Sequence, residues 1–371
     1  MKYNYKSNVL MLSRLLYFND EVICTFLDCL LKKKSLEETY FWICEYYYSE
    51  FIDETWEYLF KIYYDFYAIY HPKLESFIVE NYNKYQKDNS INYILNCVKT
   101  LYYSTPNPIV FCIRHMEYKI MSIYVGRVPK WLKALNIEEK KHINLIRSIK
   151  EFQWDNIDKL LLYLNKCSDW EKCYRDVIVY FKTVIDIKNN TILKDIPYNN
   201  KKHILLATII YCCIDVKNIK KIKKLHNFNN DVEVIHSFDE TISIYKILKK
   251  YRKYYISQHI GCFSLYRYRI NMKPSEILYN WNYYCYKTPI WNQRIKHYNG
   301  RQYSLKKTLK FPDDNMYESF YNKYNYEPDE QDIETQKKSL ITIEKTNIKY
   351  WLSSIFDNSI YYDSLPDTIY Y

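Results

Sequence analysis

Cations alternate with aromatic residues along one stretch of the chain, from about residue 250 to residue 310. Its first part reads YRKYYISQHIGCFSLYRYRINMKP, and its second part reads WNYYCYKTPIWNQRIKHYNGRQYSLKKTLK. Lys and Arg neutralise phosphates and release counterions, while aromatic rings stack on unpaired bases. This combination favours RNA or single-stranded DNA over base reading in a duplex groove. The residues expected to bind nucleic acid are Arg252, Lys253, Tyr266, Arg267, Tyr268, Arg269, Trp281, Trp291, Arg294, Lys296, Arg301, Lys306 and Lys307.

The net charge of +11 is concentrated in the same part of the chain. Residues 201–310 carry 22 basic and 6 acidic side chains, whereas residues 1–80 have a net charge of −5 and residues 311–371 a net charge of −7. Two other interpretations stay open. The lysines could form an ordinary solvated surface over an aromatic core, or the segment could bind an acidic protein. The acidic residues 311–371 could also fold back and neutralise it.

Metal ligands and catalytic groups are poorly represented. Glu139 with His142, and Glu233 with His236, have the Glu-x-x-His spacing of di-metal helical bundles, but both pairs lie in polar, solvated runs. His259 and Cys262, with Cys285 downstream, lack the second tight pair that a structural zinc site needs. We expect no metal site.

Phosphate-binding loops of the glycine-rich type are excluded, because the three glycines of the chain are isolated from one another. No G-x-S-x-G nucleophile motif occurs. We therefore expect no cofactor and no enzymatic activity. Trp281 and Trp291 could instead anchor helices to one another, and Asp313 and Asp314, next to Pro312, are expected to form a turn.

Helical periodicity dominates the elements that would position these residues. Trp56, Leu59, Phe60, Tyr63 and Tyr67 follow helical spacing. Asp53 is the expected N-cap of this helix, and Pro72 its end. Upstream, Ser35 and Glu38 form a Ser-x-x-Glu capping box before a second apolar stripe. These two helices, joined near residues 52 and 53, predict a helical hairpin.

Further segments with helical spacing indicate a mostly α, all-α-type protein of stacked helical hairpins, either an irregular helical repeat or a bundle. Residues 106–126 could form a helix or a strand pair. One Asn-Gly hairpin turn is available, at Asn299 and Gly300, which argues against a large antiparallel sheet. The other expected helices cover residues 90–103, 138–153, 155–165, 168–187, 201–214 and 240–256.

Three regions are expected. Residues 1–125 would form amino-terminal helical hairpins and residues 126–260 a central helical region. Residues 261–371 would contain the basic aromatic segment and an acidic tail, and would wrap over the helical body.

The longest apolar run, Ile204 to Ile214, is about half the length that spans a bilayer, so a buried helix is expected and no membrane partner. The amino terminus has no cleavage-site pattern of a signal peptide. Eleven cysteines form no C-x-x-C pair, and several lie in apolar runs. These features favour a reducing, intracellular setting.

Two blocks of the sequence resemble an uncharacterised protein family of nucleocytoplasmic large DNA viruses, particularly mimivirus-like giant viruses. The first block runs from SRLLYFNDEVICTFLDCLLKKKSLEETYFWICEYYYSEF to ETWEYLFKIYYDFYAIYHPKLESFI, and the second is FYNKYNYEPDEQDIETQKKS. Together they cover about a quarter of the chain. The resemblance implies a viral protein of the host cytoplasm, located in the viral factory or the virion. It transfers no catalytic or binding residue.

Two classes of function are consistent with these expectations. The first is a helical scaffold in viral gene expression that binds RNA through residues 250–310 and viral or host proteins through its helical hairpins. A translation-initiation scaffold would be one such case, although YWLSSIF at residues 350–356 only approximates the docking motif for a cap-binding partner. The second class is a virion structural or genome-packaging protein.

Overall fold

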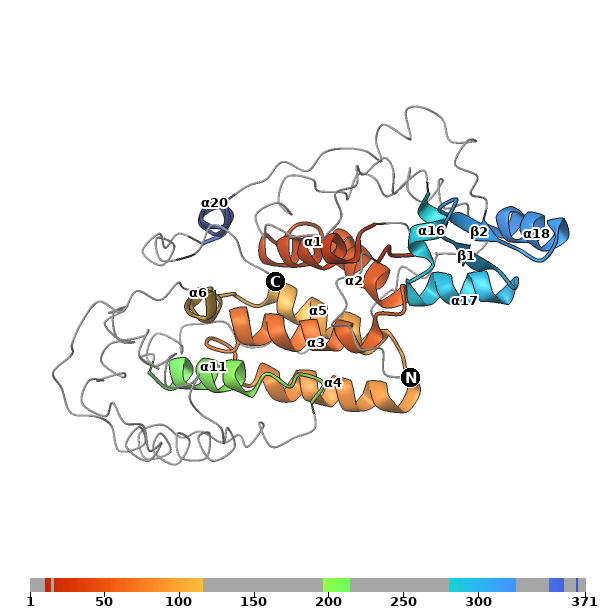
Figure 1. Cartoon of the computed structure of the whole chain (residues 1–371). Coiled ribbons are helices and arrows are strands. Elements are labelled where there is room, and N and C mark those ends of the chain that lie inside the picture. The colour runs from red at the N-terminus through yellow and green to blue at the C-terminus, as the bar shows by residue number, and fades with distance from the viewer. Residues whose placement is uncertain are drawn as a thin grey trace, which may run out of the picture. The chain divides into compact units, whose positions relative to one another are not determined.

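The described part of the protein is mostly helical (Figure 1). The computed structural model describes residues 11–14, 17–115, 196–213, 280–324, 347–356 and 365. Of these residues, 67% are helical, and the described strands form one two-stranded sheet. The predicted mostly α fold class is therefore confirmed.

The chain divides into two compact units, and each is built from segments far apart in the sequence. The described residues of the first unit are 11–14, 17–55, 280–324 and 347–351. Those of the second are 56–115, 196–213, 352–356 and 365. The domain boundaries predicted near residues 125 and 260 lie outside the described residues, so the three predicted regions stay predictions.

The first unit contains helices from both ends of the chain and one β-hairpin. In chain order its elements are α1 (Asn19–Leu31), α2 (Leu36–Tyr48), the start of α3 (Ile52–Ile62), α16 (Trp281–Cys285), α17 (Pro289–His297), β1 (Arg301–Tyr303), β2 (Thr308–Lys310), α18 (Asp314–Tyr324) and the start of α20 (Ile348–Ser353).

The second unit is helical in all its described elements. They are the rest of α3, the π-helix η1 (Tyr63–Tyr67), α4 (Leu74–Asp88), α5 (Asn92–Tyr103), α6 (Ile109–His115) and α11 (Lys201–Cys213). The predicted helices over residues 90–103 and 201–214 match α5 and α11. Residues 109–115 are helical, which settles that part of the ambiguous segment 106–126. The other predicted helices lie outside the described residues.

The start of α2 forms as its sequence predicts. The Ser35 hydroxyl accepts a hydrogen bond from the Glu38 backbone N–H at 3.1 Å, which satisfies one of the unpaired donors of the first turn. Behind this cap, Phe41 and Trp42 are buried and pack edge-to-face, with Tyr17 against both rings. All residues from Thr39 to Tyr46 are buried, so this part of α2 is enclosed by its unit on every side.

The predicted stripe from Trp56 to Tyr67 is buried at all five positions. It continues from α3 into the π-helix η1, where the Ala68 N–H donates to the Tyr63 carbonyl five residues earlier, at 2.8 Å. The predicted N-cap at Asp53 is wrong: α3 begins at Ile52, so Asp53 lies inside its first turn. There its carboxylate still meets the positive end of the helix dipole.

The helices that pack as hairpins are α1 with α2, and α4 with α5. We expected α2 to pair with the following helix. The division between the two units falls within α3, between Thr55 and Trp56, so this predicted pair is not a hairpin inside one unit. Periodicity identifies the apolar face of a helix but not the partner that covers it.

A buried ionic cluster joins three segments of the second unit. The Arg114 guanidinium donates to both carboxylate oxygens of Asp65, at 2.9 and 2.7 Å. Nε2 of His203 lies 2.9 Å from the same carboxylate, and Nδ1 of His203 lies 2.5 Å from the Tyr198 hydroxyl oxygen. Asp65 is on η1, Arg114 on α6 and His203 on α11. The cluster therefore fixes these three helices to one another.

Burial and charge act in opposite directions on the Asp65 carboxyl. Burial alone would raise its pKa, but the Arg114 guanidinium and His203 lower the pKa overall. For His203 burial is the largest cause, and it lowers the pKa of the imidazole despite the neighbouring carboxylate. His203 is then neutral at pH 7, so Arg114 is the cation that keeps Asp65 ionised.

Removing Arg114 should destabilise the second unit strongly. Arg114→Met leaves the Asp65 carboxylate buried without its cation, and we expect the free energy of unfolding to fall by roughly 3 to 5 kcal/mol. Urea denaturation of the full chain measures it. The matched control is Lys84→Met, which breaks an exposed ion pair with Glu80 and should cost no more than about 1 kcal/mol. Equal effects of the two variants would contradict the assignment.

His203 should make stability depend on pH near neutrality. Its folded-state pKa lies below the unfolded value of about 6.5, so its contribution is complete above that pH and is lost as the pH falls toward the folded pKa. We expect the free energy of unfolding to decrease from pH 7 to pH 5, and less steeply in His203→Gln. His115, whose pKa burial lowers to about 2, acts in the same direction and leaves a residual slope. Identical slopes in wild type and variant would disprove the role of His203.

Candidate nucleic-acid interface

Residues 280–310 are the described half of the predicted basic segment, and they contain seven Lys or Arg but no Asp or Glu. They form α16, α17 and the β1–β2 hairpin. The other predicted binding residues, Arg252, Lys253, Tyr266, Arg267, Tyr268 and Arg269, lie outside the described residues. Their part in binding therefore stays a prediction.

Both ends of α17 are defined by local sequence. Pro289 is its first residue, a position where the missing N–H costs nothing and the fixed φ favours the helix. At the other end Asn299 adopts a left-handed φ of 55°. The Asn299 N–H donates to the Lys296 carbonyl, and the Gly300 N–H to the Ile295 carbonyl, both at 2.9 Å. This is the hydrogen-bond pattern of a Schellman cap.

The predicted Asn-Gly hairpin turn is therefore wrong, since Asn299 and Gly300 end a helix instead. Both roles require a residue that tolerates positive φ, so the dipeptide alone does not distinguish them. The hairpin begins directly after this cap. Its strands pair antiparallel from Arg301 opposite Lys310 to Tyr303 opposite Thr308, and residues 304–307 form its loop.

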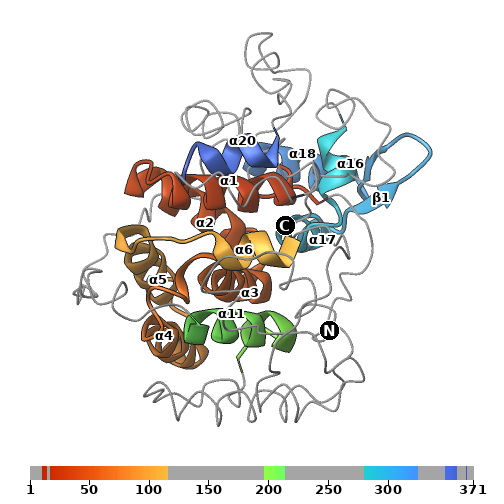
Figure 2. The same ribbon diagram turned by 90° about the vertical axis from the view of Figure 1, so that its left-hand side faces the viewer.

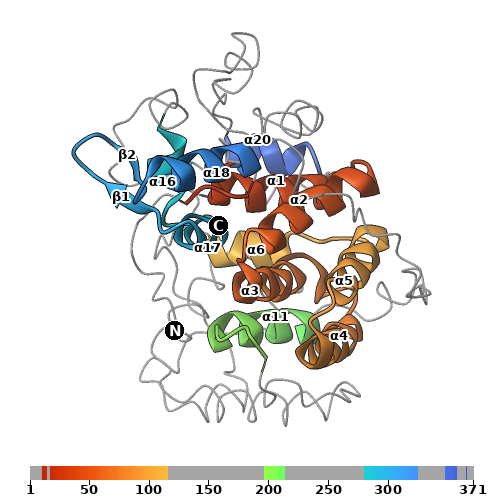
Figure 3. The same ribbon diagram turned by 90° about the vertical axis from the view of Figure 1, so that its right-hand side faces the viewer.

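The hairpin is attached to the helix before it. The Gln302 side chain donates to the Tyr283 carbonyl at 3.0 Å, which fastens β1 to α16. From that attachment the loop extends away from α16 and α17, as Figures 2 and 3 both show. The hairpin is thus held at its base and projects at its loop.

Trp281 and Trp291 are fully buried, each with 0% exposure. Their rings pack edge-to-face with centroids 5.0 Å apart, and Trp291 also packs against Tyr324. Burial leaves neither ring a face for a base, so these two residues are removed from the predicted stacking surface. They are the anchors between helices that the sequence also allowed.

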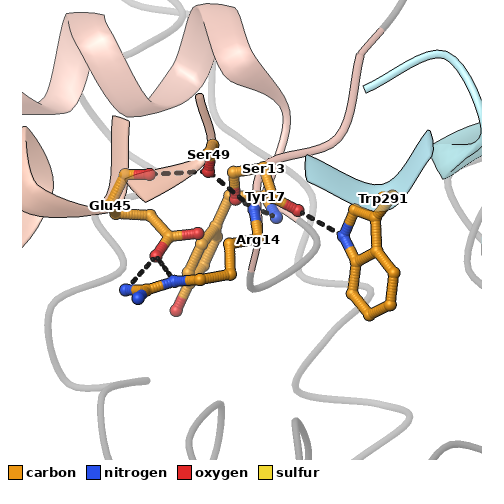
Figure 4. Close-up of polar contacts among 6 residues, drawn as sticks. All are labelled: Ser13, Arg14, Tyr17, Glu45, Ser49 and Trp291. Carbon is orange, nitrogen blue, oxygen red and sulfur yellow. Dashed lines mark hydrogen bonds and ion pairs between the residues drawn. The ribbon is translucent and has the colours of Figure 1, made fainter. Parts of the chain in front are cut away.

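The Trp291 indole also ties α17 to the amino-terminal segment (Figure 4). Its Nε1–H donates to the Ser13 carbonyl at 3.1 Å, and the Thr288 hydroxyl donates to the Leu12 carbonyl. Figure 4 shows that the next residue, Arg14, is held from α2. Its guanidinium lies 3.1 Å from the Glu45 carboxylate, and its backbone N–H donates to the Ser49 hydroxyl at 2.7 Å.

Arg294 is half-buried between aromatic rings. Its guanidinium carbon lies 4.8 Å from the centroid of the Trp291 ring and 5.0 Å from that of Tyr324. Such cation–π contacts stabilise the fold. Arg294 therefore packs against the aromatic interior and is a less available cation than its exposed neighbours.

The remaining predicted cations of the described half are exposed. Lys296 lies in the last turn of α17, Arg301 at the start of β1, and Lys306 and Lys307 in the hairpin loop. The structure adds Lys310, which is also exposed and lies directly opposite Arg301. The pairing of β1 with β2 places Lys310 beside Arg301. The sequence alone did not suggest this pairing, so Lys310 was not among the predicted binding residues.

The first carboxylates after this segment have a structural role. Asp313 lies just before α18, and its carboxylate accepts from the Met316 N–H at 2.9 Å as an N-cap. The expected turn next to Pro312 is thus the start of a helix. Most of the acidic segment beyond α18 lies outside the described residues, so its folding back over the cations stays a prediction.

Clusters of metal-ligating side chains are absent from the described residues: no group of three or more His, Cys, Asp or Glu there could hold a metal ion. Cys285, the described member of the weak zinc pattern, is buried and donates to the Asn282 carbonyl. Glu139, His142, Glu233 and His236 lie outside the described residues, as do His259 and Cys262.

None of the protein-family models, curated proteins or solved structures with which the chain was compared matches it. Among the described helices, none is long and apolar enough to cross a membrane. The α20 helix ends at Ser353, so the approximate docking motif of residues 350–356 does not form one continuous helix.

Gly300 should be essential for joining the hairpin to α17. A Cβ at this position would lie 2.7 Å from Ile295 Cγ2 and 2.7 Å from Phe311 Cε1, closer than side chains pack. We expect Gly300→Ala to lower the free energy of unfolding by about 1 to 3 kcal/mol, measured by urea denaturation. Ser304→Ala, in the exposed loop of the same hairpin, is the control and should have little effect. A Gly300→Ala variant as stable as this control would contradict the packing.

Proposed function

We propose that this protein is a non-enzymatic helical scaffold that binds RNA or single-stranded DNA through its basic segment. One observation carries the proposal: residues 280–310 contain seven Lys or Arg and no Asp or Glu. Six of these cations are exposed, among them Lys296, Arg301 and Lys306. A surface of this composition favours polyanions, because each phosphate it neutralises releases a counterion.

The fold behind these cations supports the same function. Trp281 and Trp291 fill the interior, and the Schellman cap and the Gln302 contact fix the hairpin relative to its two helices. The backbone that presents the cations is therefore ordered before any ligand binds. Preorganisation of this kind reduces the entropy lost on binding.

We extend the proposal to the biological setting that the sequence resemblance implies. The protein would act in the gene expression of a giant virus, in the viral factory of the host cytoplasm. Its helical hairpins would bind viral or host proteins. The alternative is a virion structural or packaging protein. Its cations would then bind the genome or acidic neighbouring subunits.

Neutralising exposed cations should weaken nucleic-acid binding and its dependence on salt. In the variant Lys296→Gln, Arg301→Gln, Lys306→Gln we expect the slope of log affinity against log salt concentration to be smaller by about two to three. Fluorescence anisotropy with a labelled single-stranded oligonucleotide and with a labelled RNA, each over a series of salt concentrations, measures this slope.

The matched control removes three exposed lysines from the second unit. Lys73→Gln, Lys84→Gln, Lys87→Gln changes the net charge equally but should leave the slope close to that of the wild type. Equal slopes in the two triple variants would show that general charge, and not this surface, drives binding. A wild-type protein that binds neither probe at low salt would disprove the function and leave the virion structural role.

A further inference from the structure

The most exposed large apolar side chain in the described basic segment is at the tip of the β1–β2 hairpin. Leu305 is 87% exposed, and it lies between Ser304 and the exposed Lys306 and Lys307. This leucine, followed by two lysines, gains nothing from burial within its own fold. Such a side chain becomes favourable when a partner that is both anionic and apolar covers it.

The base of the hairpin also carries a charge arrangement that disfavours the isolated protein. Arg301 and Lys310 are directly opposite each other in the antiparallel register, and both are exposed. Like charges in directly opposed positions destabilise a strand pair. A phosphate group near the two cations would convert this repulsion into attraction.

The loop itself has a defined conformation. The Lys307 N–H donates to the Ser304 carbonyl, and Lys307 adopts a left-handed φ of 49°. With Gln302 fastened to the Tyr283 carbonyl, the hairpin projects its loop away from α16 and α17 (Figures 2 and 3). Leu305 is therefore presented at the end of a short, braced arm.

Nucleic acid combines the two chemistries of this arm. Its backbone is anionic, and the faces of its bases are apolar. Aromatic stacking by Trp281 and Trp291 is excluded by their burial. An aliphatic side chain can take the place of a ring, since leucine is one of the residues that proteins insert between neighbouring bases.

We propose that the β1–β2 hairpin is an insertion arm: Leu305 enters between two adjacent bases while Arg301, Lys306 and Lys310 hold the flanking phosphates. This inference rests on the proposed nucleic-acid binding. It adds how the nucleic acid is bound and which residue unstacks its bases. The arm recognises a strand whose bases can separate, such as RNA loops or single-stranded DNA, because parting them costs least where they are unpaired.

The test uses the full chain and a single-stranded oligonucleotide with one internal 2-aminopurine, whose fluorescence rises when it loses its stacked neighbour. Wild type should raise the fluorescence on saturation. Leu305→Ser should abolish most of the rise and weaken affinity by about fivefold to tenfold, with the salt slope unchanged. Leu305→Met, which retains an aliphatic side chain, should keep the rise. Because Leu305 is exposed, none of these changes should alter folding, which circular dichroism and urea denaturation check.

Each outcome separates this inference from the proposed function. If wild type binds with a steep salt slope but Leu305→Ser gives the same fluorescence rise, the insertion arm is disproved and the binding function stands. If wild type binds neither this oligonucleotide nor the labelled RNA at low salt, both fail. If vesicles of phosphatidylcholine and phosphatidylserine bind the protein in a Leu305-dependent way and the oligonucleotide does not, the arm is a membrane contact and the inference is overturned.

Discussion

The arrangement of the first unit depends on the contact between α17 and the amino-terminal segment, 278 residues apart in the sequence. Leu12 and Ser13 are buried, and their carbonyls would be unsatisfied without partners. Thr288 and Trp291 supply both hydrogen bonds. The same indole is the centre of the aromatic interior beneath the basic segment. The contact that closes the unit therefore also positions the cations.

Residue type and spacing predict the local structure of this protein better than its long-range contacts. The Ser35 cap and the stripe from Trp56 to Tyr67 depend on neighbours within a few turns, and both form as predicted. The roles of Trp281 and Trp291 depend on residues at the other end of the chain. A tryptophan next to cations has the same local sequence whether it stacks on a base or fills a core. Sequence alone therefore located the basic segment but placed too many aromatics on its surface.

The cluster around Asp65 shows the same limit in the second unit. Asp65, Arg114 and His203 come from three segments with no common motif, and nothing in their spacing links them. Helical spacing places Asp65 on the polar side of the stripe from Trp56 to Tyr67, but the structure buries its carboxylate completely. The π-helix turns that residue inward, where a carboxylate is retained only with a cation beside it. Arg114 supplies this cation, and the packing of η1, α6 and α11 against one another depends on it.

The low glycine content of the chain imposes a further constraint on its turns. Left-handed backbone occurs in the described residues at Lys33, Glu50, Asn89, Asn299 and Lys307, none of them glycine. For residues with a Cβ this conformation costs about 1 to 2 kcal/mol, and asparagine tolerates it best. Gly300, the described glycine, lies instead where a Cβ would collide with Ile295 and Phe311. In the described residues, glycine therefore serves close packing, and turns without glycine adopt the strained left-handed backbone. In the hairpin, the residue with the strained backbone is Lys307. Strand pairing and the Gln302 contact compensate for this strain and hold the loop in place. The same contacts direct Leu305 outward.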